Sequence, residues 1–251
     1  MKFLVNFVIA GVQKGGTSAL AELLGKNHRI FMASPKELHY FDQDENYIGD
    51  IEYKKYHSYF AGCARTQIAG EATPMYMYSY DAPRRMWEYN KKMKLIFILR
   101  NPIERAYSAW NMERYRNIEN LAFIDALKSE IERRRMVLPS QHRNFSYVDR
   151  GYYSEQIRRV WNYFPKSQTF FIKTDDLMNN QQMTLNKVWD FLNVPSVQFK
   201  PIAKVFSTPY QKYMAKEEYE YLYKLFKLEI CVLEDLLGWD CSDWKQPVET
   251  Q

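Results

Sequence analysis

One stretch near the start of the chain constrains the fold more than any other. Residues 3–10 form an apolar run, broken by one Asn, with the length and composition of a buried strand. A turn at residues 11–16 contains three glycines and leads into residues 17–24, whose sequence predicts a helix. We expect Thr17 or Ser18 to cap that helix. The succession of strand, glycine-rich turn and helix indicates the first unit of a parallel α/β sheet.

This turn, which we call the anion loop (residues 11–16), has the features of a phosphate site. Unpaired N–H groups at a helix N-terminus would face it, and Gly15 and Gly16 would let an anion approach the backbone. Lys14 adds a full positive charge. The order differs from the usual P-loop, in which the lysine directly follows the second glycine. The alternative is a tight strand-to-helix connection that binds nothing.

Composition narrows the class of protein. A chain of 251 residues with 46% hydrophobic composition can bury a sizeable core, and we expect one domain spanning residues 1–251. The net charge of +5 suits an anionic ligand, but nucleic-acid binding usually needs a clustered basic stripe. Three cysteines without metal-ligand spacing favour a reducing compartment. With no cleavage signal and no run of ~18 apolar residues, we expect a cytoplasmic protein without membrane contact.

Strand and helix patterns alternate along the rest of the chain. We expect strands at residues 29–33, 67–74, 93–99 and 169–172, and helices at 52–60, 83–90, 103–116, 121–136, 151–164, 184–192 and 216–237. The long loop at 193–214 suggests a functional flap. This alternation predicts an α/β fold, a P-loop-like three-layer sandwich with a central, mainly parallel sheet flanked by helices.

Two further places carry candidate functional residues. Arg100 follows the most apolar strand, at the carboxyl end where open α/β sheets bind ligands, and Ser108 shares a face of the next helix with Glu104. Glu37 and His39 would face the same side of an extended segment, as a general-base pair requires. The alternative for this pair is surface polarity with a satisfied histidine, and the residues alone favour that alternative.

Three acidic residues follow His39 closely. We interpret Asp42, Asp44 and Glu45 as solvated loop residues.

With these segments in place, the chain resembles the PAPS-dependent sulfotransferases, in the branch of the heparan sulfate sulfotransferases and their bacterial relatives. The resemblance covers nearly the whole chain and rests on the order and spacing of several motifs. The matching segments are residues 11–20 (GVQKGGTSAL), 36–42 (KELHYFD), 71–74 (EATP) and 95–108, with weaker matches at 151–156 and 236–240.

The resemblance implies a binding site for PAPS (3′-phosphoadenosine 5′-phosphosulfate) and its product PAP. The 5′-phosphosulfate would be held by Lys14, Gly15, Gly16, Thr17 and Ser18. Arg100 and Ser108 would hold the 3′-phosphate, to which an Arg fork can donate two bonds. Tyr153 and Lys212 are further expected cofactor contacts. No metal is expected, because Lys14, the loop amides and Arg100 supply the positive charge.

The resemblance also implies an in-line transfer with Glu37, Lys14 and His39 as catalytic residues. Glu37 would accept the proton of an acceptor hydroxyl or amine, and Lys14 would stabilise charge on the bridging oxygen as PAP leaves. His39 would orient Glu37 or contact the acceptor. Positioning and charge stabilisation supply most of the catalysis in the related phosphoryl transfers.

Two departures from the family pattern bear on the acceptor and the adenine. Ala72 replaces a lysine of the heparan enzymes, which favours a small metabolite over an anionic glycan, with a glycan or lipid as alternatives. The late Lys-Gly pair is missing, which leaves Lys204, Tyr210 and Lys212 as adenine-side candidates. The acceptor pocket is expected among residues 42–59, 75–84 and 117–147. Neither the acceptor nor the oligomeric state is readable from the sequence.

Two other classes of function remain open. A P-loop-like nucleotide kinase would require Mg²⁺ and ATP, but the chain has neither the Gly-Lys-Ser/Thr order nor a clear strand-ending Asp for the metal. A non-catalytic nucleotide-binding module would tolerate Glu37→Ala, whereas a transferase would lose turnover and keep its cofactor affinity.

Overall fold

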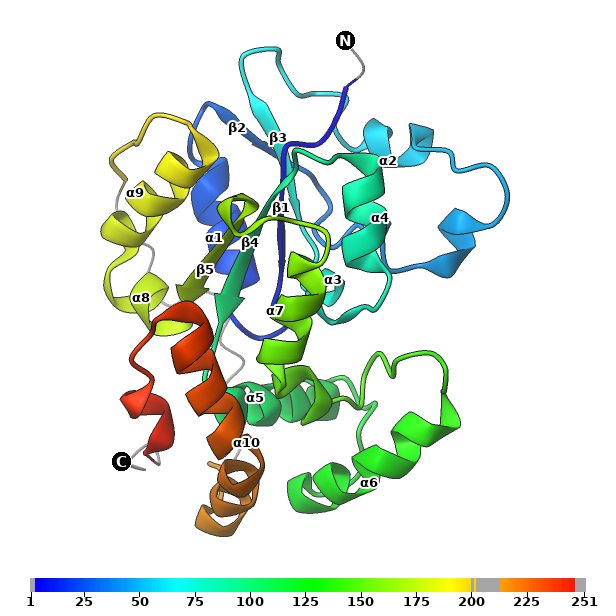
Figure 1. Cartoon of the computed structure of the whole chain (residues 1–251), viewed down its shortest axis with the longest axis vertical. Helices are drawn as coiled ribbons and strands as arrows, with labels where there is room; N and C mark the ends of the chain where they lie inside the picture. The colour runs from blue at the N-terminus through cyan, green and yellow to red at the C-terminus, as the bar shows by residue number, and fades with distance from the viewer. Residues whose placement is uncertain (1–2, 200, 202–212, 247–251) are drawn as a thin grey trace. The chain divides into compact units, whose positions relative to one another are not determined.

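The computed structural model describes residues 3–199, 201 and 213–246 (Figure 1). These residues form two compact units. The first unit contains the described residues of Met1–Leu99 and Arg159–Phe206, and the second contains those of Arg100–Arg158 and Ser207–Gln251. Within this described part, no helix is long and apolar enough to cross a membrane.

The first unit is built on a five-stranded sheet. Its strands are β1 (Phe7–Gly11), β2 (Ile30–Met32), β3 (Ile68–Ala72), β4 (Lys94–Leu99) and β5 (Thr169–Lys173). They are arranged in the order β2-β3-β1-β4-β5, and every neighbouring pair is parallel. β1 lies at the centre of the sheet, with β3 and β2 on one side and β4 and β5 on the other. Open α/β sheets bind ligands at the carboxyl ends of strands around such a point.

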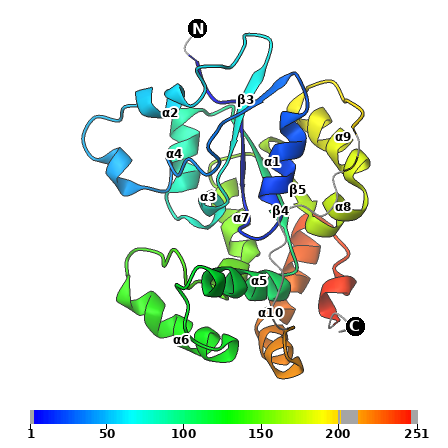
Figure 2. The same cartoon turned by 180° about the vertical axis from the view of Figure 1, so that it is seen from behind.

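One face of this sheet is covered by α1 (Thr17–Gly25), α8 (Thr174–Asn179) and α9 (Gln181–Leu192), as Figure 2 shows from behind. Their apolar side chains form a buried cluster with the strands, to which Ile9, Leu23, Ile96, Leu177 and Trp189 belong. Burying a large aliphatic side chain contributes about 1.5–3 kcal/mol. This cluster therefore fixes α1 directly behind the end of β1.

The opposite face of the sheet meets α3 (Met75–Tyr78). Phe97 alternates along β4 with residues of the buried cluster and so points to this second face. A Cβ atom on Gly11 would lie 2.8 Å from Cβ of Met77 and 3.3 Å from the ring of Phe97. Gly11 is therefore required for this close packing.

Helices α2 (Lys54–Ser58) and α4 (Ala82–Tyr89) complete the described α-helices that lie wholly in the first unit, which also contains 3₁₀ helices at Asp44–Tyr47 and Lys166–Gln168. The N–H of Val5, just before β1, donates to the hydroxyl of Tyr89 at 3.0 Å, which joins α4 to the start of the sheet. The parallel sheet with flanking helices confirms the α/β architecture predicted from the sequence.

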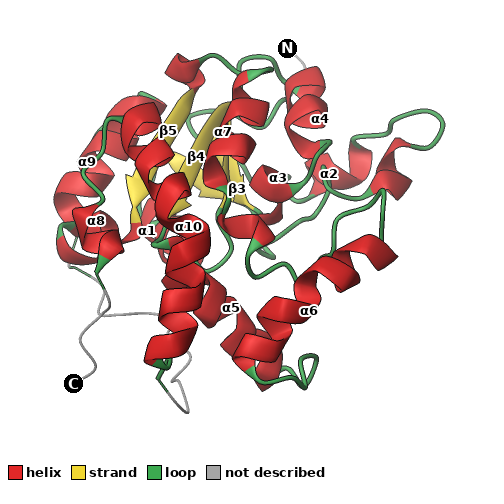
Figure 3. Cartoon of the chain, turned by 60° about the horizontal axis from the view of Figure 1, so that its bottom comes forward, coloured by secondary structure: helices red, strands yellow, loops and turns green. Residues whose placement is uncertain are grey.

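The second unit is helical. It contains α5 (Pro102–Tyr115), α6 (Phe123–Met136) and α10 (Lys216–Leu237), and α7 (Tyr153–Trp161) runs from it into the first unit (Figure 3). A Cβ atom on Gly151 would lie 2.4 Å from the ring of Phe226 and 3.3 Å from Cβ of Pro102. Glycine at this position therefore allows α10 to pack against the start of α5.

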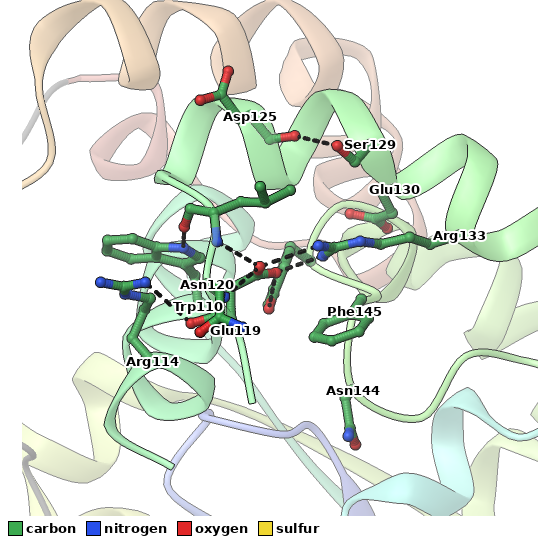
Figure 4. Close-up of polar contacts among 12 residues, drawn as sticks. Trp110, Arg114, Glu119, Asn120, Asp125, Ser129, Glu130, Arg133, Asn144 and Phe145 are labelled. Atoms are coloured by element: carbon green, nitrogen blue, oxygen red, sulfur yellow. Dashed lines mark hydrogen bonds and ion pairs between the residues drawn. The ribbon is translucent and has the colours of Figure 1, made fainter. Parts of the chain in front are cut away.

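A buried carboxylate, Glu119, joins α6 to the loop that follows α5 (Figure 4). It accepts hydrogen bonds from Nη2 of Arg133 at 3.1 Å and from the hydroxyl of Tyr147 at 3.0 Å. The backbone N–H groups of Asn120 and Leu121 donate to it at 2.9 Å each. These bonds hold the loop between α5 and α6 in place, although the loop itself contains no helix or strand.

The structure differs from the sequence prediction in its short elements. All five strands lie where they were predicted, but the four residues of α3 and the six of α8 were not predicted as helices. Periodicity needs about two turns to stand out, and neither helix has them. Most of the loop expected at residues 193–214 lies outside the described residues.

Candidate active site

The anion loop is pressed against the end of β4. The N–H of Val12 donates to the carbonyl of Ile98 at 3.0 Å, and the N–H of Gly15 donates back to the carbonyl of Val12 at 3.0 Å. A Cβ atom on Gly15 would lie 2.3 Å from the carbonyl oxygen of Ile98. Only glycine fits there, so Gly15 allows the loop to pack directly against the backbone of β4.

The cap of α1 differs from the prediction. Gly16 is the N-cap residue, with a left-handed φ of 107°, and α1 begins at Thr17. No side chain caps this helix, so the expectation that Thr17 or Ser18 would do so is wrong. The left-handed glycine turns the chain into the helix one residue earlier than a Ser/Thr cap would. The first N–H groups therefore stay uncapped, as an anion site requires.

A residue distant in sequence braces this loop. The hydroxyl of Thr174, the first residue of α8, lies 2.7 Å from the carbonyl of Gly15 and 3.1 Å from that of Leu99. Lys14 is half-buried with a left-handed φ of 68°. Bracing by β4 and α8 holds the shape of the loop before any ligand binds.

Residues 36–42, which we call the catalytic segment, hold a carboxylate, an imidazole and a second carboxylate in a row. Nε2 of His39 lies 3.5 Å from Oε2 of Glu37, and its Nδ1 lies 2.9 Å from Oδ2 of Asp42. Glu37 and His39 have left-handed φ values of 64° and 50°. The segment is thus not extended, and the two side chains meet through its curvature rather than through strand alternation.

The carboxylate of Glu37 is ionised at neutral pH. The hydrogen bond from His39 lowers the pKa of Glu37 to about 2, and Lys36, whose Nζ lies 2.7 Å away, adds to this while burial opposes it. Glu37 therefore carries no proton at neutral pH, although the bonds from His39 and Lys36 that lower its pKa also make it a weaker base. His39 is held between two carboxylates.

Asp42 is a residue of the candidate site that the sequence analysis missed. It was expected in a solvated loop, but its side chain has 0% exposure and pairs with His39, so that expectation is wrong. The spacing of three residues between the histidine and the aspartate was the available signal. Asp44, by contrast, is exposed and bonds to Arg85.

The catalytic segment is attached to the strand beside β1. The N–H of Glu37 donates to the carbonyl of Ala72 at the end of β3, at 3.0 Å. The N–H of Thr73, the next residue, donates to the carbonyl of Ile9 in β1 at 3.1 Å. Because β1 and β3 are neighbouring parallel strands, the catalytic segment and the anion loop both follow carboxyl ends at the centre of the sheet.

The second unit holds the residues predicted for the 3′-phosphate. Nε and Nη2 of Arg100 donate to one oxygen of Glu104 at 3.0 and 2.8 Å. Ser108 is buried one turn further along α5. The side chain of Asn101 accepts from the N–H of Ile103 at 3.0 Å and so caps this helix. Glu104 therefore holds the guanidinium group of Arg100 on the Ser108 face.

Tyr153 supports Arg100 from behind. Its hydroxyl donates to the backbone carbonyl of Arg100 at 2.9 Å, and its side chain is fully buried. Burial raises the pKa of this hydroxyl, so it stays protonated and keeps donating.

The predicted site residues thus fall in two groups, one in each unit, and Lys204, Tyr210 and Lys212 lie outside the described residues. Across residues 3–199, 201 and 213–246, no group of three His, Cys, Asp or Glu residues could hold a metal ion.

A parallel sheet that carries a glycine loop and an uncapped helix end after its central strand is an arrangement that nucleotide-binding α/β proteins use. The comparison with protein families makes this specific. The family described as "Sulfotransferase domain" matches residues 5–229, which span both units, and the chain belongs to that family. The resemblance drawn from the sequence motifs is confirmed.

Individual relatives agree with this assignment. The chain is 32% identical over 201 residues to heparan sulfate glucosamine 3-O-sulfotransferase 5 of Mus musculus, a match that covers 76% of this chain and 54% of the relative. The chain thus spans about half the length of that relative. It is 24% identical to the membrane-associated sulfotransferase kil1 of Dictyostelium discoideum, with 94% of this chain and 66% of that protein covered.

A solved structure resembles the chain over nearly its full length. The crystal structure of a sulfotransferase from Alicyclobacillus acidocaldarius has a TM-score of 0.83 and 25% sequence identity, and the match covers 98% of this chain and 100% of that one.

Proposed function

We propose that this chain transfers a sulfuryl group from PAPS to a hydroxyl or amine of an acceptor. One observation carries the proposal. The anion loop follows β1 and leads into a helix that no side chain caps. The ionised Glu37 is hydrogen-bonded through its N–H to the end of β3, the parallel strand beside β1. An anion site beside a proton acceptor is what transfer of an anionic group to a hydroxyl requires.

The residues of the chain fit PAPS at its phosphosulfate end. The first N–H groups of α1 are not capped by a side chain, and Gly15 lets the loop pack directly against the carbonyl of Ile98, which fixes the position of those N–H groups. Lys14 through Ser18 would hold the phosphosulfate, and Arg100 and Ser108 the 3′-phosphate. When bound, PAPS supplies an activated sulfuryl group with PAP as its leaving group.

Each catalytic side chain then has one task. As the acceptor oxygen or nitrogen forms its bond to sulfur, the bond from sulfur to the bridging oxygen of PAP breaks, and the acceptor proton passes to Glu37. Lys14 stabilises the charge that develops on the bridging oxygen. His39, hydrogen-bonded by Asp42, orients the carboxylate of Glu37.

For the acceptor we propose a small metabolite first, and a heparan-like glycan or a lipid as alternatives. Support comes from Ala72, whose buried side chain stands where the resemblance expects a lysine facing an anionic glycan. The names of relatives such as the mouse 3-O-sulfotransferase point toward the glycan. A cytoplasmic location stays a prediction, which the three free cysteines favour.

Ligand-induced stabilisation tests the cofactor. A ligand at 100 times its Kd adds about 2.7 kcal/mol, so PAP without metal should raise the melting temperature by several degrees. Arg100→Ala should abolish that shift, whereas Arg84→Ala, which removes an exposed, ion-paired arginine of α4, should keep it. Stabilisation by Mg-ATP alone would favour the kinase and reject this proposal.

Turnover tests the chemistry. PAP release from PAPS should be followed with water alone, with a heparan sulfate oligosaccharide, and with a panel of small phenols and alcohols. We expect the fastest release with a small hydroxyl compound, and Glu37→Gln should lower it at least ~100-fold while PAP binding stays intact. Full turnover in that variant would exclude Glu37 as the base.

A further inference from the structure

A second glutamate, Glu71, lies buried near the end of β3, and its carboxyl group is hydrogen-bonded by three hydroxyl groups. Its Oε1 accepts from the hydroxyls of Tyr56 at 2.8 Å and Tyr76 at 3.1 Å, and its Oε2 accepts from the hydroxyl of Thr73 at 2.7 Å. In the described part of the chain no basic side chain pairs with it. A carboxyl group buried without a cation is costly, so its retention calls for a role beyond packing.

The hydroxyl of Tyr76 connects this carboxyl to the catalytic segment. A tyrosine has one O–H to donate, and Tyr76 gives it to Glu71. Its oxygen is therefore left to accept, and the backbone N–H of Tyr40 donates to it at 2.9 Å, with the N–H of Phe41 at 3.5 Å. By accepting the hydrogen bond of the Tyr76 hydroxyl, Glu71 thus orients that hydroxyl so that its oxygen accepts from the backbone of the catalytic segment.

The two residues held in this way lie between His39 and Asp42. The catalytic segment has no helix or strand of its own, and two of its residues have left-handed φ. Its chain position therefore depends on individual bonds. The carbonyls of Tyr40 and Phe41 are bound from elsewhere by Asn46 at 2.9 Å and Arg85 at 3.1 Å, but their N–H groups are bound by Tyr76.

We propose that Glu71 is a positioning residue that acts through the Tyr76 hydroxyl to fix the backbone between His39 and Asp42, and so holds His39 against Glu37. This inference rests on the proposed function of Glu37. It adds to the site a buried carboxyl group that acts through the hydroxyl of Tyr76.

Electrostatics agree with this geometry. Burial, together with a smaller effect of the negative charge of Asp42, raises the pKa of Glu71 to about 7, while the hydrogen bonds of the three hydroxyls act in the opposite direction. The carboxyl groups of Glu71 and Asp42 therefore interact electrostatically, and the backbone that Tyr76 binds belongs to the same segment as Asp42.

Tyr56 provides a matched control for Tyr76. Both rings are fully buried, and both hydroxyls donate to the same oxygen of Glu71. Only the hydroxyl of Tyr76 also accepts from the catalytic segment, since Tyr56 meets Tyr40 and Phe41 through ring packing, at centroid distances of 4.8 and 5.1 Å. Replacing either tyrosine by phenylalanine deletes one oxygen and keeps the ring.

The experiment compares Tyr76→Phe with Tyr56→Phe in the full chain, with PAPS as the probe and PAP release in water as the activity. Because small misplacements of reacting groups cost up to ~100-fold, Tyr76→Phe should lower kcat by about 10–100-fold. Tyr56→Phe should stay within about twofold of wild type. Both variants should bind PAP as wild type does, because neither tyrosine touches the anion loop.

A spectroscopic readout separates positioning from general loss of structure. The chain has four histidines, so the imidazole ¹⁵N signals can be assigned with a His39→Asn variant. Tyr76→Phe should shift the His39 signals and leave the other three, whereas Tyr56→Phe should leave all four. Equal losses of kcat in the two variants, or unchanged His39 signals in Tyr76→Phe, would overturn the inference.

A second pair of variants, Glu71→Gln and Glu71→Ala, tests the inference if Tyr76→Phe does not fold. Glu71→Gln keeps an oxygen that accepts from both tyrosines, so it should retain most of the turnover, whereas Glu71→Ala should lose it. Similar turnover in these two variants would also reject the inference. If Glu37→Gln keeps full activity, the proposed function itself fails; if only Glu37→Gln loses activity, the positioning role alone fails.

Discussion

Gly15 occupies a position where no side chain fits, and its replacement tests the anion loop directly. A Cβ there would lie 2.3 Å from the carbonyl of Ile98, so Gly15→Ala must displace the loop from β4. We expect a loss of about 1–3 kcal/mol in unfolding free energy and at least a tenfold loss in PAP affinity. Urea unfolding and PAP-dependent melting measure the two effects.

Gly25, at the other end of α1, is the matched control for Gly15. A Cβ there would lie 3.7 Å from Met32, an ordinary contact. Gly25→Ala should therefore change stability by less than about 1 kcal/mol and leave PAP affinity intact. Wild-type affinity in Gly15→Ala would mean that the phosphosulfate binds elsewhere.

Asp42 offers a second test at the scale of single residues. Asp42→Asn keeps the shape of the side chain but removes the charge that holds Nδ1 of His39. We expect kcat for PAP release to fall about tenfold or more, with unchanged PAP affinity. Glu45→Gln removes an exposed charge from the same loop and should leave both quantities unchanged. Equal rates in the two variants would show that His39 needs no carboxylate.

Residues whose role is local could be predicted from the sequence, and those whose role depends on the fold could not. The glycines and Lys14 of the anion loop stand in one short run, and Asn101 caps its helix from two residues away. Thr174 braces Gly15 across 159 positions of sequence, and nothing local marks it. Glu71 likewise acquires its role only when α2 and α3 bring their tyrosines to β3.

At the scale of elements, the attachment of α6 depends on a carboxyl group that an amide cannot replace. Glu130 accepts from the N–H groups of Val148 and Asp149, at 2.7 and 2.8 Å, one on each oxygen. Glu130→Gln would turn one acceptor into a donor that faces an N–H. We expect it to cost about 1–3 kcal/mol of unfolding free energy.

Glu71→Gln makes an informative comparison, because the partners of Glu71 are hydroxyls that can reverse their direction. We expect this variant to stay within about 1 kcal/mol of wild type at pH 5, in urea unfolding. A larger loss for Glu71→Gln than for Glu130→Gln would contradict this account of the two buried carboxyls.

The elements were predictable to the extent that their patterns were long. Apolar runs marked β1, β2, β4 and β5, whereas β3 includes Gly70 and Glu71. The limits of α10 agree with its prediction, because 22 residues give six turns of periodicity. The start of α1 at Thr17 was predicted, but its cap was misassigned, because a left-handed Gly16 caps the helix and a φ value leaves no trace in hydrophobic periodicity. The curvature of the catalytic segment was hidden for the same reason.

For the whole molecule, the dependence of stability on pH is dominated by the three carboxyl groups of the described residues whose pKa values are shifted furthest, Glu37, Glu71 and Glu130. The pKa values of Glu71 and Glu130 are raised by burial to about 7, so their contribution is full below the ordinary 4.5 and is lost as pH rises through 7. Glu37, with its pKa lowered to about 2, contributes above 4.5 and loses this as pH falls toward 2. Its partial exposure makes that contribution small.

The unfolding free energy should therefore be highest near pH 4–5 and fall by several kcal/mol toward pH 8, since each pKa unit is worth about 1.4 kcal/mol. Urea titrations at pH 4.5, 6 and 8 measure this. Glu71→Gln should flatten the decline by removing one of the two titrating groups. A stability that rises from pH 5 to 8 would show that neither carboxyl is protonated in the fold.

The left-handed backbone at Glu37 and His39 has an evolutionary consequence. Residues with a Cβ are strained in that region by roughly 1 kcal/mol each, and glycine is not. A population selected for thermal robustness alone would drift toward glycine at both positions and would lose its chemistry as it gained stability. Laboratory evolution of a more stable variant should therefore be screened for turnover in every round, because glycine substitutions at Glu37 and His39 would raise stability and abolish turnover.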